Sequence, residues 1–95
     1  MSMKEAYEQK LQAQLDEWSA EIDKLKAKAD SAEADAQLDY QKHIEVLQSK
    51  KEAAAHKLTE LKNASSDAWE ELKAGLDDAW NSLADAVKSA ASKMK

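Results

Sequence analysis

The feature that most constrains the fold is an apolar residue at every third or fourth position along almost the whole chain. The sequence contains no proline and only one glycine, Gly75. Spacing of this kind aligns apolar side chains on one face of a helix, whereas the strict alternation of a half-buried strand is nowhere sustained. Proline and glycine are the usual markers of turns between strands, and they are nearly missing. The sequence therefore predicts an all-α fold that forms a single domain over residues 1–95.

The composition supports long helices. Charged residues make up 35% of the 95 positions, and alanine, glutamate, lysine and leucine dominate. This composition is typical of coiled coils and long helices. Most apolar steps alternate between four and three, as in a coiled-coil seam, and a few consecutive steps of four relax the supercoil. We therefore expect rather straight helices in a coiled coil or helical bundle.

One interruption of the helix is predicted at residues 63–66. Asn63 is suited to the left-handed position that follows a helix, and Ser65 or Ser66 is suited to cap a new one. This break predicts a long helix over about residues 4–62 and a second, amphipathic helix over about residues 66–93.

A continuous helix remains an alternative, because the apolar spacing runs unbroken from Leu58 through Leu61, Ser65 and Ala68 to Leu72. Such a helix would be about 140 Å long at 1.5 Å per residue.

Either geometry predicts self-association. In a hairpin of unequal helices the second helix covers only part of the first, and the N-terminal half of the long helix keeps an exposed apolar stripe. Exposed stripes of this size usually mark interfaces. We expect a homo-oligomer, with an antiparallel dimer favoured. The predicted oligomer or partner interface consists of Leu11, Leu15, Trp18, Ile22, Leu25, Tyr40, Ile44, Leu47, Leu58, Leu61, Trp69, Leu72, Leu76, Trp80, Leu83 and Val87.

The pair Ala-Trp occurs twice near the C-terminus, and Trp69 and Trp80 are eleven residues apart. Because three helical turns take about eleven residues, both rings lie on one face. Two hypotheses follow: this face packs on another helix, or it binds a lipid surface as amphipathic helices do. Residues 64–95 hold six acidic side chains and four lysines, which gives no attraction to anionic lipid. Packing on protein is the favoured hypothesis.

Several classes of function are not expected. The net charge is −5 and there is no arginine, which disfavours nucleic-acid binding. The two histidines, His43 and His56, follow Asp39 and Glu52 by four residues, and these pairs are interpreted as helix-stabilising and not as metal ligands. There is no cysteine and no glycine-rich phosphate loop. We therefore predict no catalytic residues, no metal, no cofactor and no small-molecule substrate.

No long apolar segment suggests a secretory signal or a membrane span, so a cytoplasmic protein is expected.

Two stretches, "LDEWSAEIDKL" and "SSDAWEELKAG", are similar to a family of short bacterial proteins labelled coiled-coil domain-containing and, in some cases, stress-response proteins. The resemblance implies a small cytoplasmic helical protein connected to stress, and it carries no catalytic or ligand residues. A looser likeness to the amphipathic helices of apolipoproteins comes from the eleven-residue period. The first functional hypothesis is thus a non-enzymatic, self-associating structural or interaction module. The second is an amphipathic protein that binds membranes or exposed hydrophobic surfaces reversibly.

Overall fold

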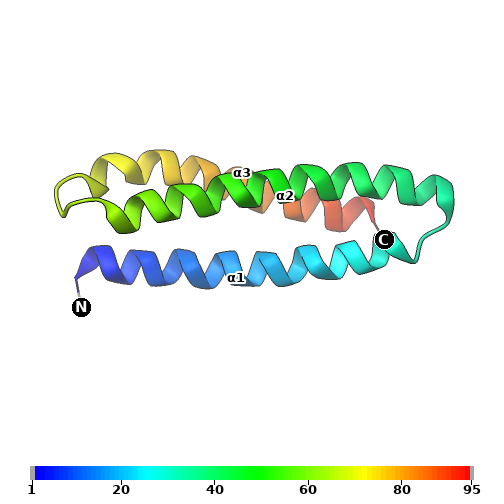
Figure 1. Ribbon diagram of the computed structural model, residues 1–95, viewed down its shortest axis with the longest axis horizontal. Coiled ribbons are helices and arrows are strands. Elements are labelled where there is room, and N and C mark those ends of the chain that lie inside the picture. The colour runs from blue at the N-terminus through cyan, green and yellow to red at the C-terminus, as the bar shows by residue number, and fades with distance from the viewer. Residues whose placement is uncertain (1, 95) are drawn as a thin grey trace.

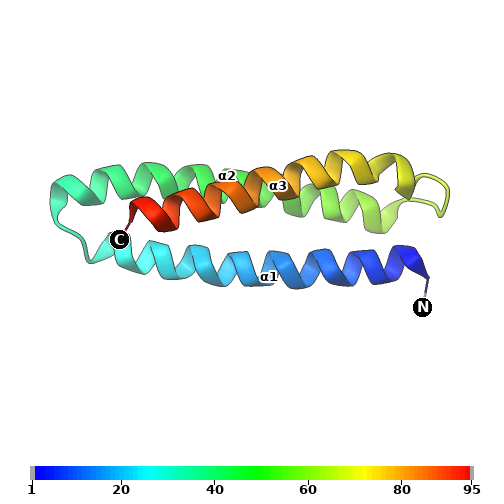
Figure 2. The same ribbon diagram turned by 180° about the vertical axis from the view of Figure 1, so that it is seen from behind.

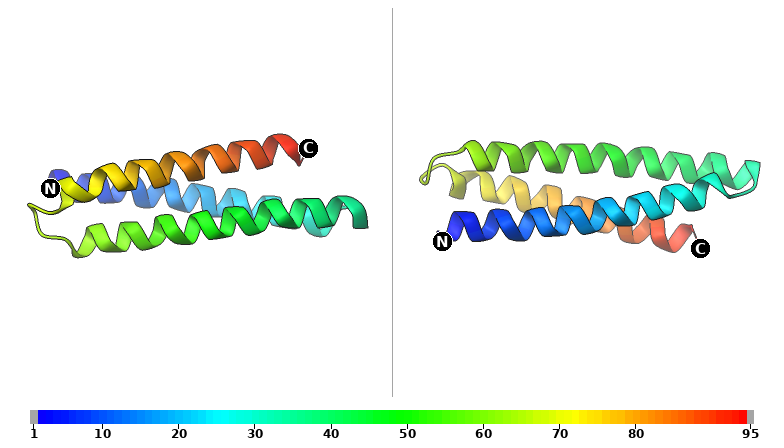
Figure 3. Two further views of the ribbon diagram at one scale, coloured as in Figure 1. Left: turned by 90° about the horizontal axis from the view of Figure 1, so that it is seen from above. Right: turned by 60° about the horizontal axis from the view of Figure 1, so that its bottom comes forward.

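The computed structural model describes residues 2–94, and within them it has three α-helices: α1 (Met3–Asp30), α2 (Ala34–Asn63) and α3 (Trp69–Lys93). The helices lie side by side in an elongated bundle of 51 × 20 × 18 Å (Figure 1). Successive helices are antiparallel, so α1 and α3 run in the same direction (Figure 2). Each helix contacts both of the others (Figure 3).

The all-α prediction is confirmed, but the predicted long helix over residues 4–62 is wrong. The chain reverses at Ser31–Glu33 and divides that segment into α1 and α2. The Ser31 N–H still donates to the Ala27 carbonyl at 3.2 Å, and then Glu33 takes an extended conformation with φ −63° and ψ 154°. The reversal lets α1 bury its apolar face against the rest of the same chain. Because alanines alone mark the stripe around residue 32, interrupting the helix there gives up little core.

A second interruption lies between α2 and α3, at the place predicted for it. α2 ends at Asn63 and α3 begins at Trp69. The Ser65 hydroxyl accepts a hydrogen bond from the Ala68 N–H at 3.2 Å within this turn. The prediction that Ser65 or Ser66 caps the second helix is wrong, because the N-cap residue of α3 is Ala68 and no side chain caps that helix. The second helix also starts later than residue 66, because residues 66–68 form a turn. Asn63 does not take the left-handed conformation. No non-glycine residue of the described chain has a positive φ, and Ala64 is extended instead.

The core is a continuous apolar seam between the three helices. Its largest fully buried side chains are Ile22, Leu47, Leu61, Leu76, Leu83 and Met94. Over residues 2–94 no polar or charged residue is buried. The hydrogen bonds that join different helices lie at the edges of the bundle, such as those from Lys62 Nζ to Gln12 Oε1 at 3.0 Å and from Lys50 Nζ to Ser82 Oγ. Apolar burial therefore supplies most of the stability of the bundle.

None of the helices in the described part of the chain has an apolar segment long enough to cross a bilayer.

Candidate functional site

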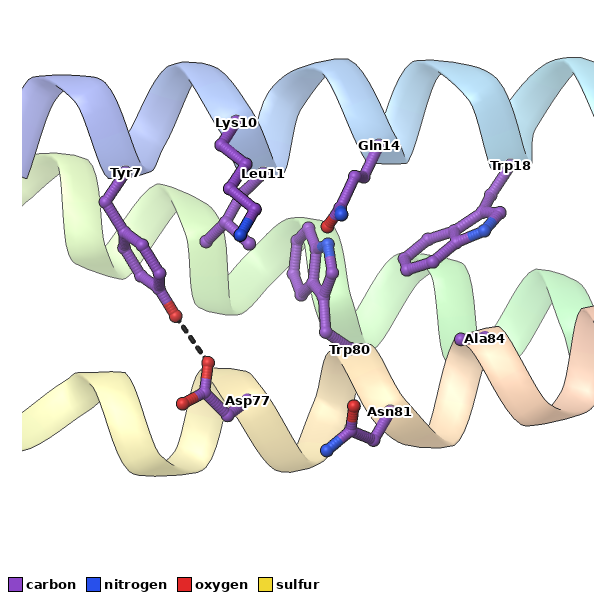
Figure 4. A pocket seen from close by; sticks show the side chains of 9 residues that line it. All are labelled: Tyr7, Lys10, Leu11, Gln14, Trp18, Asp77, Trp80, Asn81 and Ala84. Atoms are coloured by element: carbon purple, nitrogen blue, oxygen red, sulfur yellow. Dashed lines mark hydrogen bonds between the residues drawn. The ribbon is translucent and has the colours of Figure 1, made fainter.

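A groove of about 350 Å³ lies between the parallel helices α1 and α3 (Figure 4). Its lining residues come from only these two helices: Tyr7, Lys10, Leu11, Gln14 and Trp18 from α1, and Asp77, Trp80, Asn81 and Ala84 from α3. Leu11 and Trp80 are buried, whereas Lys10, Asp77 and Asn81 are exposed. The groove therefore has an apolar floor and a polar rim that is open to solvent.

Helical spacing explains why these side chains share one surface. On α1, Tyr7, Leu11, Gln14 and Trp18 follow one another at steps of four, three and four, which places them on a single face. On α3 the same steps of three and four relate the lining residues from Asp77 to Ala84. The lining faces of α1 and α3 meet because both helices pack against α2 and also contact each other, and both run in the same direction.

Two aromatic pairs join α1 to α3 along this seam. The ring centroids of Tyr7 and Trp69 are 5.9 Å apart at an interplanar angle of 46°, and those of Trp18 and Trp80 are 6.0 Å apart at 52°. Such tilted pairs contribute about 0.5–1.5 kcal/mol each beyond the area that they bury. Tyr7 and Trp18 are eleven residues apart, like Trp69 and Trp80. The eleven-residue repeat on α3 thus meets a matching repeat on α1.

The equal spacing on the two helices explains which residues Trp69 and Trp80 contact in the folded chain. Eleven residues advance a helix by about 16 Å, so equal spacings on parallel helices bring both pairs into contact at once. In this structure, Trp69 and Trp80 pack on protein.

Tyr7 forms the polar contact between α1 and α3. Its hydroxyl donates a hydrogen bond to Asp77 Oδ1 at 2.5 Å, and Lys73 Nζ lies 5.3 Å from the centre of its ring. Burial raises the pKa of Tyr7 well above its usual value of 10, and the hydrogen bond to Asp77 and the negative charge of that carboxylate raise it further. The phenol therefore stays protonated and keeps donating to Asp77 at neutral pH.

The indole nitrogen of Trp80 is buried and has no hydrogen-bond partner. A buried N–H without an acceptor costs about 1–3 kcal/mol. Figure 4 shows the side chain of Gln14 directed toward the Trp80 ring from α1.

The lining of the groove combines aromatic surface, the amides of Gln14 and Asn81, the ammonium of Lys10 and the carboxylate of Asp77. This set of groups is suited to apolar contact and hydrogen bonding.

The predicted interface residues lie against one another within a single chain. All of them are buried except Trp18, Tyr40 and Leu72, and these three are partly buried against the same core. The core also contains residues that were not predicted for the interface: Ala29, Ala54, Ala90 and Met94. The stripe of α1 that was expected to be exposed is therefore covered by α2 and α3.

Sequence reasoning did not predict the polar lining of the groove. Lys10, Gln14, Asp77 and Asn81 carry no local signal of a shared site, because nothing near them in the sequence says that α1 and α3 run parallel. The matching eleven-residue spacings of aromatic residues on the two helices were the signal that could have paired them.

In the part of the chain that the structure describes, no group of three or more His, Cys, Asp or Glu side chains is placed to hold a metal ion. His56 Nε2 lies 3.1 Å from Glu60 Oε1, so it pairs with the acid that follows it in the helix and not with Glu52.

Comparisons with protein-family models, with curated proteins and with solved structures gave no match to this chain.

Proposed function

We propose that this protein is a non-enzymatic helical module that associates with further copies of itself and serves as a structural or interaction element. The observation that carries the proposal is the composition of the core, in which no residue from 2 to 94 buries a polar or charged side chain. Buried polar groups are the usual devices that fix helix register and partner number. A core without a buried polar or charged residue accepts an equivalent helix from a second copy as readily as its own.

The polar contacts between helices do not restrict this exchange. The Lys62–Gln12 hydrogen bond is exposed, and the Lys50–Ser82 hydrogen bond is only partly buried. Hydrogen bonds in such solvent-accessible positions add little to the free energy of unfolding, since water replaces them easily. A helix of another copy would also form the same contacts.

The basis of self-association differs from the one that the sequence suggested. The bare N-terminal stripe of a long helix would have required an oligomer, but here Leu11, Leu15 and Ile22 are buried within one chain. We therefore propose an association that depends on protein concentration, in which contacts within one chain are replaced by the same contacts between two copies. A cytoplasmic setting and a connection to stress, which the family resemblance implies, belong to this proposal.

Sedimentation velocity over a wide range of protein concentration tests the proposal. A species with the mass of two or more chains should grow as the concentration rises, following mass action. A single monomeric species at every concentration would contradict self-association.

The groove favours a second candidate function, reversible binding to membranes or other hydrophobic surfaces. The α1–α3 seam is open to solvent along one side, and Trp18 is only partly buried there. Opening of this seam would present the apolar faces of both helices to a lipid surface.

Tryptophan emission with vesicles of zwitterionic phosphatidylcholine tests this second candidate. A blue shift upon addition of vesicles would support lipid binding, and Trp18→Phe should reduce the shift because its ring lies at the open side. Tryptophan emission that does not change at any lipid concentration would contradict lipid binding.

A further inference from the structure

We propose that two copies of this chain exchange α1, with Ser31–Glu33 straightening so that one continuous helix runs from Met3 to Asn63. The proposal rests on the proposed self-association and specifies its geometry. In the exchanged dimer, α1 of one copy takes the place of α1 on the α2 and α3 helices of the other.

The connection between α1 and α2 contains nothing that requires a turn. Only Ser31, Ala32 and Glu33 separate the two helices. Ser31 is still in the helical region, with φ −94° and ψ 0°, whereas Glu33 is extended. None of the three is glycine or proline, and none has a positive φ. All three can therefore adopt helical angles without steric cost, and alanine does so most readily.

Backbone hydrogen bonds at this turn run from the Ala32 N–H to the Ala29 carbonyl at 3.2 Å and from the Gln37 N–H to the Glu33 carbonyl at 2.7 Å. The side-chain hydrogen bonds of the turn are exposed. Ser31 Oγ donates to the Lys28 carbonyl at 3.1 Å, and Gln37 Nε2 donates to the Asp30 carbonyl at 3.3 Å. Glu33, the N-cap residue of α2, makes no capping hydrogen bond with its side chain. A straight helix would replace these side-chain contacts with backbone hydrogen bonds between residues four positions apart.

The apolar stripe continues through the turn in the sequence. Ala29, Ala32, Ala36 and Tyr40 follow one another at steps of three, four and four, so they would share one face of a straight helix. That face joins the buried residues of α1 to those of α2. The two long helices would then lie antiparallel about a twofold axis, and every core contact that α1 makes in the monomer would form again between copies. Exchange of an identical element is a low-cost route to a dimer for this reason.

Charge at the hinge acts against straightening. In the monomer, Glu33 and Asp35 lie at the N-terminus of α2, where the helix dipole favours negative charge. In a continuous helix both would lie in mid-helix, and Glu33 would lie beside Asp30, three positions before it, where like charges repel. This balance provides a matched pair of variants at position 33.

Glu33→Pro should hold the chain in its monomeric form. Its φ of −63° already matches that of proline, and its N–H makes no backbone hydrogen bond that proline would remove. Proline inside a continuous helix would instead break it. We expect Glu33→Pro to weaken dimerisation by on the order of a hundredfold per hinge, since proline is strongly disfavoured in a helix interior. The control Glu33→Ala should dimerise at least as strongly as the unmodified chain.

Sedimentation velocity of the unmodified chain and the two variants separates the two proposals. Monomer at all concentrations for the unmodified chain overturns self-association itself. A dimer that persists unchanged in Glu33→Pro overturns the exchange of α1 and leaves self-association standing. Circular dichroism should show the same helix content for the Glu33→Pro monomer as for the monomer of the unmodified chain.

Cross-linking provides a readout that does not depend on proline. The chain has no cysteine, so single cysteines can be placed at Gln12→Cys and Lys62→Cys, whose native side chains meet across α1 and α2 at 3.0 Å. The two single variants are unfolded, mixed, refolded together at high concentration and treated with a short bis-maleimide reagent. Exchange predicts a product that joins one chain of each kind. Dimers that form only through the outer faces would leave the two cysteines in separate bundles, and absence of the mixed product would overturn the proposal.

Discussion

At the α2–α3 end of the bundle an aromatic pair packs between the helices, whereas the buried residues nearest the α1–α2 turn are two alanines and a methionine. Tyr7 and Trp69 pack together at the first end, beside the turn that contains the Ser65–Ala68 hydrogen bond. Ala29, Ala90 and Met94 are buried toward the second end, beside the Ser31–Glu33 turn. The packing at the first end therefore depends on particular large side chains, whereas the packing at the second end depends on small side chains that contribute little apolar area.

The helices separate more easily at one end of the bundle than at the other. A buried aromatic ring contributes far more apolar area than an alanine does, so separating the helices costs more at the aromatic end. The alanine-rich end is the natural position for a hinge.

Trp69→Ala should destabilise the bundle by about 3–5 kcal/mol, because a large buried ring at the aromatic end is lost and a cavity remains. Met94→Ala at the other end should cost about 2 kcal/mol, the lower limit for a buried methionine, because the end of a helix relaxes easily. Urea unfolding followed by circular dichroism measures both. Equal losses of unfolding free energy for Trp69→Ala and Met94→Ala would show that the two ends of the bundle are equally stable.

Ser65→Ala should cost about 1 kcal/mol, since it removes one of the two acceptors of the Ala68 N–H, which also donates to the Ser65 carbonyl at 3.1 Å. The corresponding change in the other connection, Ser31→Ala, should stay within about 0.5 kcal/mol, because its hydroxyl makes only one exposed hydrogen bond to a carbonyl. The same urea titrations compare the two. A larger loss for Ser31→Ala would show that the α1–α2 turn is specified by its side chains after all.

Gly75→Ala should stabilise the protein by about 0.5–1 kcal/mol, because glycine in a helix loses more conformational entropy than alanine. Gly75 is exposed in α3 between the two tryptophans, and the nearest heavy atom to an added Cβ is Lys57 Nζ at 3.9 Å. The neighbouring exposed change Ala74→Gly is the control and should lose a similar amount. A destabilised Gly75→Ala would mean that α2 and α3 approach more closely here than the structure shows.

The contribution of Tyr7 to stability should disappear in strongly alkaline solution. Its pKa is raised in the folded protein, so the folded state favours the protonated phenol. This stabilisation is fully present below the ordinary tyrosine pKa of about 10 and decreases as the pH rises above it. The free energy of unfolding of the unmodified chain minus that of Tyr7→Phe should be constant from pH 7 to about pH 9 and then fall. A constant difference up to higher pH would show that the Tyr7–Asp77 contact does not influence ionisation.

Much of the bundle could be predicted because helical periodicity is a local property. The three- and four-residue steps predicted the all-α fold and selected residues such as Leu11, Ile44 and Leu83, which are buried in the structure. The place of the break near Ser65 was predictable as well, since asparagine and serine favour helix ends and turns locally, although neither serine caps α3. The turn at Ser31–Glu33 was not, because alanine and glutamate are good helix formers and give no local signal.

The candidate site depended on that missing turn. While the chain was expected to continue from residue 4 to residue 62, α1 and α3 had no reason to meet, and the Tyr7–Asp77 hydrogen bond could not be anticipated. Trp18 and Trp80 were both predicted to be apolar interface residues, but only the fold shows that they contact each other.

The helical fold, the apolar face of each helix and the shared face of Trp69 and Trp80 follow from local periodicity, because side-chain direction repeats every 3.6 residues. Local periodicity does not predict that the chain turns at Ser31–Glu33, that α1 runs parallel to α3, or that the two aromatic repeats meet, as the folded chain shows. The reason is that a turn without glycine, proline or a cap has no local preference. Its position follows from the apolar area that α1 buries against α2 and α3, which lie far away in the sequence.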